Sequence, residues 1–104
     1  MENKTKAQTF IGFAIRAKKY RIGMNAVQTL KKINLLIVCC SASENTKKEA
    51  QKVASKYHCK LLTTKEVKLE EMTHKENSKV MAVIDVALAK AILDNCENEF
   101  IVNI

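Results

Sequence analysis

The segment that decides the fold is Ile33-Asn34-Leu35-Leu36-Ile37-Val38-Cys39-Cys40, which is continuously apolar from Leu35 onward. An apolar run without polar alternation is typical of a strand that is buried on both faces of an α/β sheet. The run is far too short to cross a bilayer as a helix, which takes about 20 apolar residues. It therefore predicts a central strand that is covered by helices on both sides.

The sequence on either side alternates between helical and strand patterns. Before the central strand we predict a helix over residues 5–19, a short strand over 20–22 and a helix over 24–32. After it we predict a helix over 44–58, a strand over 59–64, a short helix over 65–73, a strand over 80–84 and a helix over 86–94. Residues 99–104 form either a final strand or an ordered tail. This order predicts one domain, residues 1–104, built as a three-layer α/β/α sandwich with a central mixed four-stranded sheet.

Side-chain periodicity assigns faces to the two longest predicted helices. In the helix over 5–19, the residues with the spacing of a core-facing stripe are Phe10, Phe13, Ala14 and Ala17, and Ile11 and Ile15 widen it. Gly12 is expected to let a neighbouring element approach this helix closely. In the helix over 44–58, Ser43 is the expected N-cap. A basic row on the same helix is expected to face solvent and consists of Lys48, Lys52 and Lys56.

The net charge of +7 is concentrated in the first part of the chain. Residues 1–60 contain thirteen of the eighteen Lys and Arg but three of the eleven Asp and Glu. Such asymmetry favours a polyanionic partner, and nucleic acid is the usual one. The alternative is that the lysines serve solubility alone.

The sequence lacks the residue patterns that usually carry catalysis or hold a cofactor. The four cysteines, at positions 39, 40, 59 and 96, form no Cys-x-x-Cys pair, so we expect no metal site. There is no Gly-rich phosphate loop, no pair of carboxylates and no spacing suggestive of a catalytic triad. We therefore expect a protein that is not an enzyme and has no cofactor. Residues 1–6 lack the apolar core of a signal peptide, which predicts a cytoplasmic protein without a membrane partner.

The candidate binding segment is Arg21-Ile22-Gly23-Met24-Asn25-Ala26-Val27-Gln28-Thr29-Leu30-Lys31-Lys32. Gly23 is expected to form a turn into the helix over 24–32, because glycine reaches backbone angles that strain other residues. The inner face of this helix then consists of Met24, Val27 and Leu30, and the outer face of Asn25, Gln28, Thr29 and Lys32. The outer face and the helix N-terminus can donate hydrogen bonds to phosphate oxygens and base edges.

Four blocks of sequence, at residues 10–19, 22–23, 42–48 and 80–89, resemble one known family in the same order. The chain resembles the kink-turn-binding ribosomal protein family, specifically its short bacterial branch of stand-alone ribosome-associated proteins. Large-subunit ribosomal proteins of eukaryotes and archaea and the archaeal box C/D RNA-binding protein belong to the same superfamily. The resemblance implies an α/β/α sandwich that binds structured RNA, ribosomal RNA included, and it implies no DNA partner.

Members of this family dock on sheared G·A pairs through a motif of glycine, any residue, asparagine, glutamate, two residues and lysine. Gly23 and Asn25 match the motif, whereas Ala26 stands at the glutamate position and Thr29 at the lysine position. Alanine cannot accept hydrogen bonds from base amino groups, and threonine is shorter than lysine and uncharged. A second family element, the loop before the late strand, packs against the flipped-out nucleotide; here it has no glycine and carries Lys75, Asn77, Ser78 and Lys79.

Two functions from different classes follow from these observations. The first is a non-enzymatic RNA-binding protein that recognises a kink-turn or internal loop through the start of the second helix and associates with ribosomes. Its predicted RNA-binding residues are Arg21, Gly23, Met24, Asn25, Gln28, Thr29, Lys31, Lys32, Lys75, Asn77, Ser78 and Lys79. The alternative is a protein-interaction module of the same fold that has lost specific RNA recognition, as the residues at positions 26 and 29 suggest.

Overall fold

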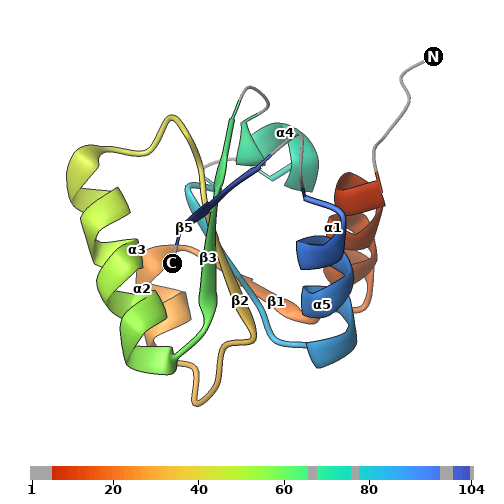
Figure 1. Ribbon diagram of the computed structural model, residues 1–104, viewed down its shortest axis with the longest axis horizontal. Coiled ribbons are helices and arrows are strands. Elements are labelled where there is room, and N and C mark those ends of the chain that lie inside the picture. The colour runs from red at the N-terminus through yellow and green to blue at the C-terminus, as the bar shows by residue number, and fades with distance from the viewer. Residues whose placement is uncertain (1–5, 66–67, 76–77, 97–99, 104) are drawn as a thin grey trace.

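The computed structural model describes residues 6–65, 68–75, 78–96 and 100–103 (Figure 1). Within these ranges the helices are α1 (Lys6–Arg16), α2 (Met24–Gln28), α3 (Glu44–Tyr57), α4 (Leu69–Thr73) and α5 (Val86–Asp94). The strands are β1 (Tyr20–Ile22), β2 (Leu35–Val38), β3 (Lys60–Thr64), β4 (Val80–Val83) and β5 (Phe100–Asn103). The predicted mixed α/β fold is confirmed, and most elements are shorter than the sequence pattern indicates.

The strands form one sheet in the order β1-β4-β2-β3-β5. β2 and β3 are parallel, and the other neighbouring strands are antiparallel. The four-stranded sheet expected from the sequence is therefore wrong: β5 adds a fifth strand, in which Phe100 pairs with Thr64 and Asn103 with Leu61. The sequence left residues 99–104 as either a final strand or an ordered tail, and pairing with the outer edge of β3 makes residues 100–103 a strand.

The two faces of the sheet bury separate apolar clusters. Leu35 and Ile37 of β2 belong to a cluster with residues of α1, α4 and α5. Leu36 and Val38 belong to a second cluster with residues of α2 and α3. Because successive side chains of a strand point to opposite faces, all four β2 residues are at most 1% exposed. The prediction that this strand is buried on both faces is confirmed, and Figure 1 shows the two groups of helices on either side of it.

Helix α1 packs through part of the expected stripe, since Ile11 and Ala14 are buried and Phe10 and Ile15 pack against the core, whereas Phe13 and Ala17 are exposed. Its buried residues are Ala7, Ile11 and Ala14. Phe13 is 42% exposed instead, and its ring stacks edge to face on Phe10 with the centroids 5.9 Å apart. The expected stripe is wrong at this point because several overlapping sets of residues in α1 have helical spacing. Packing in the cluster shared with α4 and α5 selects the set Ala7, Ile11 and Ala14.

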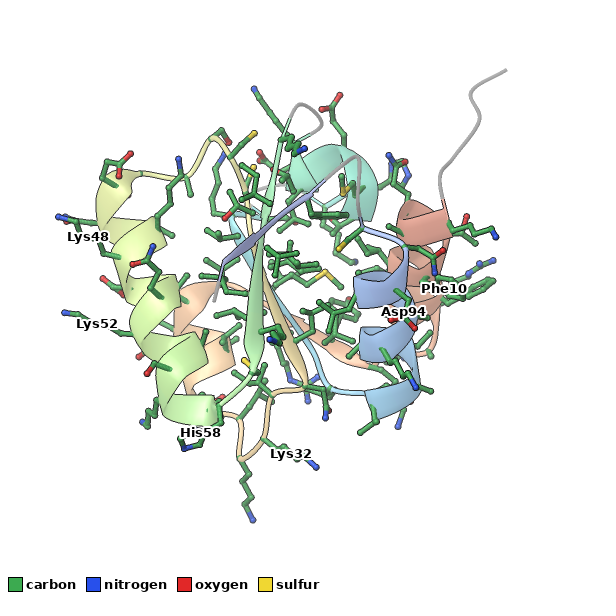
Figure 2. The ribbon with its side chains drawn as sticks, viewed as in Figure 1. Phe10, Lys32, Lys48, Lys52, His58 and Asp94 are labelled. Atoms are coloured by element: carbon green, nitrogen blue, oxygen red, sulfur yellow. The ribbon has the colours of Figure 1, made fainter. Side chains whose placement is uncertain are left out.

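Side-chain caps fix the beginnings of α3 and α5. The Ser43 hydroxyl accepts a hydrogen bond from the Thr46 N–H at 3.1 Å, which confirms the predicted N-cap. A carboxylate oxygen of Asp85 accepts a hydrogen bond from the Leu88 N–H at 2.9 Å. Figure 2 shows that Lys48 and Lys52 extend from α3 away from the sheet, so the basic row of this helix is a solvated face, as predicted.

Candidate nucleic-acid interface

Gly23 forms the predicted turn between β1 and α2. Its φ of 98° and ψ of 140° lie in a region that is essentially restricted to glycine. The Gly23 N–H donates to the Val80 carbonyl at 2.9 Å, which ties the turn to the first residue of β4. The loop that precedes β4 therefore leads up to the turn, and the structure brings together the two segments that the sequence predicts to bind RNA.

Helix α2 ends four residues earlier than predicted. The N–H groups of residues 29 and 30 bond to carbonyls three residues earlier, at 3.2 Å each, and the Thr29 hydroxyl donates to the Ala26 carbonyl at 2.7 Å. Such tight bonding closes the last turn of a helix. Lys31 and Lys32 consequently lie in the following loop, so the expected placement of Lys32 on the outer face of the helix is wrong. The Thr29 hydroxyl is engaged by the backbone.

The faces of α2 otherwise agree with the prediction. Val27 is fully buried, and Met24 and Leu30 are partly buried against the same cluster. Asn25 and Gln28 are exposed. Met24 therefore helps to pack the helix onto the sheet, while Asn25 and Gln28 are its outward polar groups.

An open groove of about 430 Å³ lies along β1, which is an edge strand of the sheet. The residues that line it come from the turn after α1, from β1, from α2 and from the loop after α4. They are Lys18, Tyr20, Arg21, Ile22, Ala26 and Lys75. Three of these are cationic, and none of the lining residues that the structure describes is acidic. The Lys75 ammonium lies over the Tyr20 ring, 5.8 Å from its centroid. Cations beside an aromatic ring suit the phosphates and unstacked bases of RNA.

The position of Lys75 is set by buried hydroxyl groups next to it. Ser78 is fully buried, its hydroxyl donates to the Lys75 carbonyl at 2.7 Å, and it lies 2.9 Å from the Thr73 hydroxyl. The Lys75 N–H donates to the same Thr73 oxygen at 3.2 Å. The prediction that Ser78 contacts RNA is therefore wrong, because the side chain is inside the protein and holds the loop. Asn77, also predicted to bind RNA, lies outside the described residues.

Lys18 enters the groove because of the way α1 ends. It adopts a left-handed conformation with φ of 59°, and the N–H groups of residues 18 and 19 bond to the carbonyls of Ile15 and Ala14 at 3.2 and 2.9 Å. Glycine is usual at such a helix end, because a β-carbon is strained there. Lys18 was not among the predicted RNA-binding residues, although it lines the groove.

Tyr20 is the second groove residue that sequence reasoning missed. The signal available for it was an aromatic residue inside the basic stretch that runs from Arg16 to Arg21. Arg21 itself is exposed, and its guanidinium donates to the Tyr20 carbonyl at 2.7 Å. This bond holds the guanidinium near the strand, and a guanidinium has five N–H donors with which to bind phosphate.

Lys79 faces a different part of the molecule, which we call the Lys79 corner and which consists of Lys79, Glu70, Ser41 and Cys39. The ammonium lies 2.9 Å from a Glu70 carboxylate oxygen and 2.9 Å from the Ser41 hydroxyl. The hydrogen bond and the charge of Glu70 raise the pKa of Lys79. Lys79 was predicted to contact RNA, and the structure shows its charge engaged within the protein.

Cys39 completes this corner. Its sulfur lies 3.1 Å from the Ser41 hydroxyl and accepts the Leu69 N–H at 3.4 Å. Burial raises the pKa of the Cys39 thiol, but the hydrogen bonds with Ser41 and Leu69 and the charge of Lys79 together lower it below its ordinary value. The polar groups of this corner therefore bond to one another, while part of the Lys79 side chain is exposed to solvent.

Lys31 and Lys32 lie beyond the opposite end of α2 from Gly23. Both side chains are exposed, and their loop enters the sheet where the Asn34 N–H donates to the Val83 carbonyl at 3.0 Å. Because α2 lies between them and the turn, the two lysines do not join the groups around Gly23.

A second hollow, of about 330 Å³, lies between α1 and α4. Gly12 lines it, and a β-carbon added there would have no heavy atom within 4 Å. The expectation that Gly12 permits a close helix contact is therefore wrong. The hollow is more enclosed than the groove, but its charged groups have both signs. Glu71 accepts the Lys68 N–H at 2.9 Å, and Arg16 lies 4.9 Å from the Phe13 ring, so the hollow suits a polyanion less well.

The described part of the chain contains no helix long and apolar enough to cross a membrane. It also contains no group of three or more His, Cys, Asp or Glu that could hold a metal ion. The structure shows no disulfide bond among the described residues, which include all four cysteines.

No family model and no curated protein match this chain. Among solved structures, it is similar to a protein with unknown function from Bacillus halodurans, with a TM-score of 0.75 and 22% sequence identity. The match covers 88% of this chain and 96% of the other. This likeness shows that the two proteins share a fold.

Proposed function

We propose that this chain is a non-enzymatic RNA-binding protein that recognises structured RNA, a kink-turn or internal loop, in the groove along β1. The proposal identifies the fold with the three-layer α/β/α sandwich of the kink-turn-binding ribosomal proteins that the sequence resembles. It includes a cytoplasmic location and association with ribosomal RNA, and it includes no cofactor, membrane or DNA partner.

The observation that carries the proposal is the composition of the groove. Lys18, Arg21 and Lys75 line the groove together with Tyr20, the Lys75 ammonium lies over the Tyr20 ring, and no described lining residue is acidic. Nucleic-acid affinity depends mainly on cations placed against phosphates. Proteins that bind unpaired RNA add aromatic rings on which bases stack, at about 1–3 kcal/mol per base.

The groove assigns distinct roles to its neighbours. Arg21 and Lys75 bind phosphate, and Tyr20 stacks on a base that the internal loop exposes. The exposed amides of Asn25 and Gln28, on α2 beside the groove, hydrogen-bond to base edges. Ala26 lines the groove where the family that the chain resembles has glutamate, so this wall contacts bases through an apolar surface.

A binding titration of a kink-turn RNA against a straight duplex of the same length tests the proposal. The wild-type protein is expected to prefer the kink-turn. A variant with both Tyr20→Ala and Arg21→Gln is expected to lose this preference, because it lacks the stacking ring and the guanidinium. The control variant, Lys48→Gln with Lys52→Gln, loses charge on the solvated face of α3 and is expected to keep the preference.

Two outcomes contradict the proposal. One is equal, weak binding of the wild-type protein to both RNAs. The other is a preference that the groove variant retains as fully as the α3 variant does.

A second candidate function, a protein-interaction module, is favoured by one observation on β5. This strand lies at the other edge of the sheet, and Ile101 and Val102 are 49% and 45% exposed. Exposed apolar residues on an edge strand are typical of surfaces that pair with another chain. A partner captured from nuclease-treated lysate should be lost with Ile101→Lys and kept with Val86→Lys, a change at an equally apolar position on α5 that is 63% exposed.

A further inference from the structure

We infer that a second basic surface, at the end of the sheet where β1, β2 and β3 begin, binds the phosphate backbone of a double-stranded RNA stem. We call this surface the basic end; it consists of Lys18, Lys19, Lys31, Lys32 and Lys60. The inference rests on the proposed function and extends it from the unpaired nucleotides in the groove to the duplex that flanks them.

Strand register brings the basic end together. Tyr20 pairs with Val83, Val83 with Leu35, and Leu35 with Lys60, so these four residues form one row across the sheet. Neighbouring strands lie about 4.8 Å apart, so the row is roughly 14 Å long. Lys18 and Lys19 directly precede one end of the row, and Lys60 forms the other end. The Ile84 N–H, which donates to the Lys19 carbonyl at 3.0 Å, ties that end to β4.

The loop that carries Lys31 and Lys32 reaches the same end of the molecule. The Asn34 N–H bonds to the Val83 carbonyl at 3.0 Å, in the middle of the row. The Tyr57 hydroxyl of α3 lies within hydrogen-bond distance of the Gln28 and Leu30 carbonyls, which fixes the start of this loop. Figure 2 shows Lys32 and His58 at this common end.

The charges of the basic end are available to a ligand. All five lysines are exposed, and within the described residues none of them forms an ion pair. The acidic residue that the described part of the chain places next to this end is Asp85, which follows Ile84. Its carboxylate is partly buried and caps α5 through the Leu88 N–H at 2.9 Å.

The chemistry of the basic end suits a duplex backbone rather than unpaired bases. Lysine is a flexible point charge that binds phosphate but carries no planar group for stacking or bidentate base contact. The groove, in contrast, has the Tyr20 ring and the Arg21 guanidinium. Lys18 belongs to both surfaces, so a stem that leaves the groove can continue onto the basic end.

The test compares two double variants that lose the same charge, Lys31→Gln with Lys32→Gln on the basic end and Lys48→Gln with Lys52→Gln on α3. Each is titrated with a kink-turn RNA and a straight RNA duplex at several KCl concentrations. The slope of log K against log salt is negative, and each lost phosphate contact makes it less negative by about 0.7–0.9. The basic-end variant should therefore have a slope less steep by roughly 1.5 and bind both RNAs more weakly by the same factor, while the α3 variant leaves the slope nearly unchanged.

The outcomes separate this inference from the proposed function. Equal slope changes in the two double variants overturn the inference, and the groove function still stands if Tyr20→Ala with Arg21→Gln abolishes the kink-turn preference. Retention of that preference by the groove variant overturns the proposed function, whatever the slopes are. The inference is also overturned if the basic-end variant binds both RNAs normally but loses binding to vesicles of anionic phospholipid.

Discussion

Lys75 and Lys79 are four residues apart in one predicted RNA-binding loop, yet the structure gives them opposite surroundings. Lys75 projects over the Tyr20 ring in a groove whose other charged lining residues are cationic. Lys79 lies 2.9 Å from the Glu70 carboxylate and 2.9 Å from the Ser41 hydroxyl. The positive charges of the groove can therefore be neutralised by a ligand, whereas the positive charge of Lys79 is already paired with the Glu70 carboxylate.

The formal charge of a segment therefore does not measure its capacity to bind a polyanion. A lysine that already donates to a carboxylate has part of its charge neutralised and fewer N–H donors left for phosphate, so it contributes less to binding a polyanion. The net charge of +7 is consequently less informative than the way in which individual cations are paired. Four measurements test whether the cations of the groove and of the Lys79 corner differ in this way.

The largest effect is expected at the turn that forms one end of the groove. Gly23→Ala should destabilise the protein by about 1–3 kcal/mol, because alanine is strained at this φ and ψ. Urea unfolding measures the change. Gly12→Ala is the matched control: its added β-carbon also meets open space, but helical geometry favours alanine by about 1 kcal/mol. Equal effects of the two substitutions would contradict a strained turn.

The second effect compares the two lysines directly. Lys75→Gln should weaken binding of the kink-turn RNA about tenfold, because a hydrogen bond to a charged group contributes about 1.5 kcal/mol. Lys79→Gln should change the affinity by less than about twofold, because its charge is engaged by Glu70. Fluorescence anisotropy at one salt concentration gives both values. A larger loss of RNA affinity in the Lys79 variant than in the Lys75 variant would contradict the assignment of the groove as the RNA-binding site.

The third effect concerns Lys18, which lines the groove and has a left-handed backbone conformation. Lys18→Gly should stabilise the protein by about 1 kcal/mol, because glycine is unstrained at this φ, yet it should weaken RNA binding. His58→Gly is the control, since His58 has a φ of 56° at the end of α3 and does not line the groove. Thermal unfolding should show a gain for both variants. RNA binding of the Lys18 variant as tight as that of the wild-type protein would argue against a role for Lys18 in the groove.

The smallest effect concerns the Lys79 corner itself. The pKa of Cys39 is lowered, whereas burial raises the pKa of Cys59, so Cys39 should ionise first as the pH rises. The pKa of Cys39 is lower in the folded state than in the unfolded state, so the Cys39 thiolate stabilises the fold. This contribution is complete above the unfolded-state pKa and is lost as the pH falls through the folded-state pKa. Lys79→Gln should shift the Cys39 titration upward and leave Cys59 unchanged, as followed by NMR of the cysteine β-carbons. Ionisation of Cys59 before Cys39 would contradict this picture of the corner.

Local signals in the sequence predicted the features that depend on one element. The apolar run from Leu35 predicted β2, the serine at position 43 predicted a helix cap, and Gly23 predicted the turn. Each is decided within a few residues, by burial on both faces of a strand, by one side-chain hydrogen bond, or by backbone sterics.

Features that depend on the docking of two elements were not predictable in the same way. The core stripe of α1, the open space beside Gly12 and the burial of Ser78 all follow from which neighbour an element meets. The groove residues Lys18 and Tyr20 were missed for the same reason, since a lysine and a tyrosine become a binding surface only when Lys75 is folded over them.

The sequence by itself determined the mixed α/β fold, the buried central strand, the glycine turn and the excess of positive charge. Tertiary structure alone decided that the sheet has a fifth strand, that Lys75 is available and Lys79 is engaged, and that lysines from three separate segments share one end of the sheet. The physical reason is that secondary structure is governed by interactions between residues near in sequence, whereas the pairing of a charge depends on groups that only the fold brings within a few ångströms.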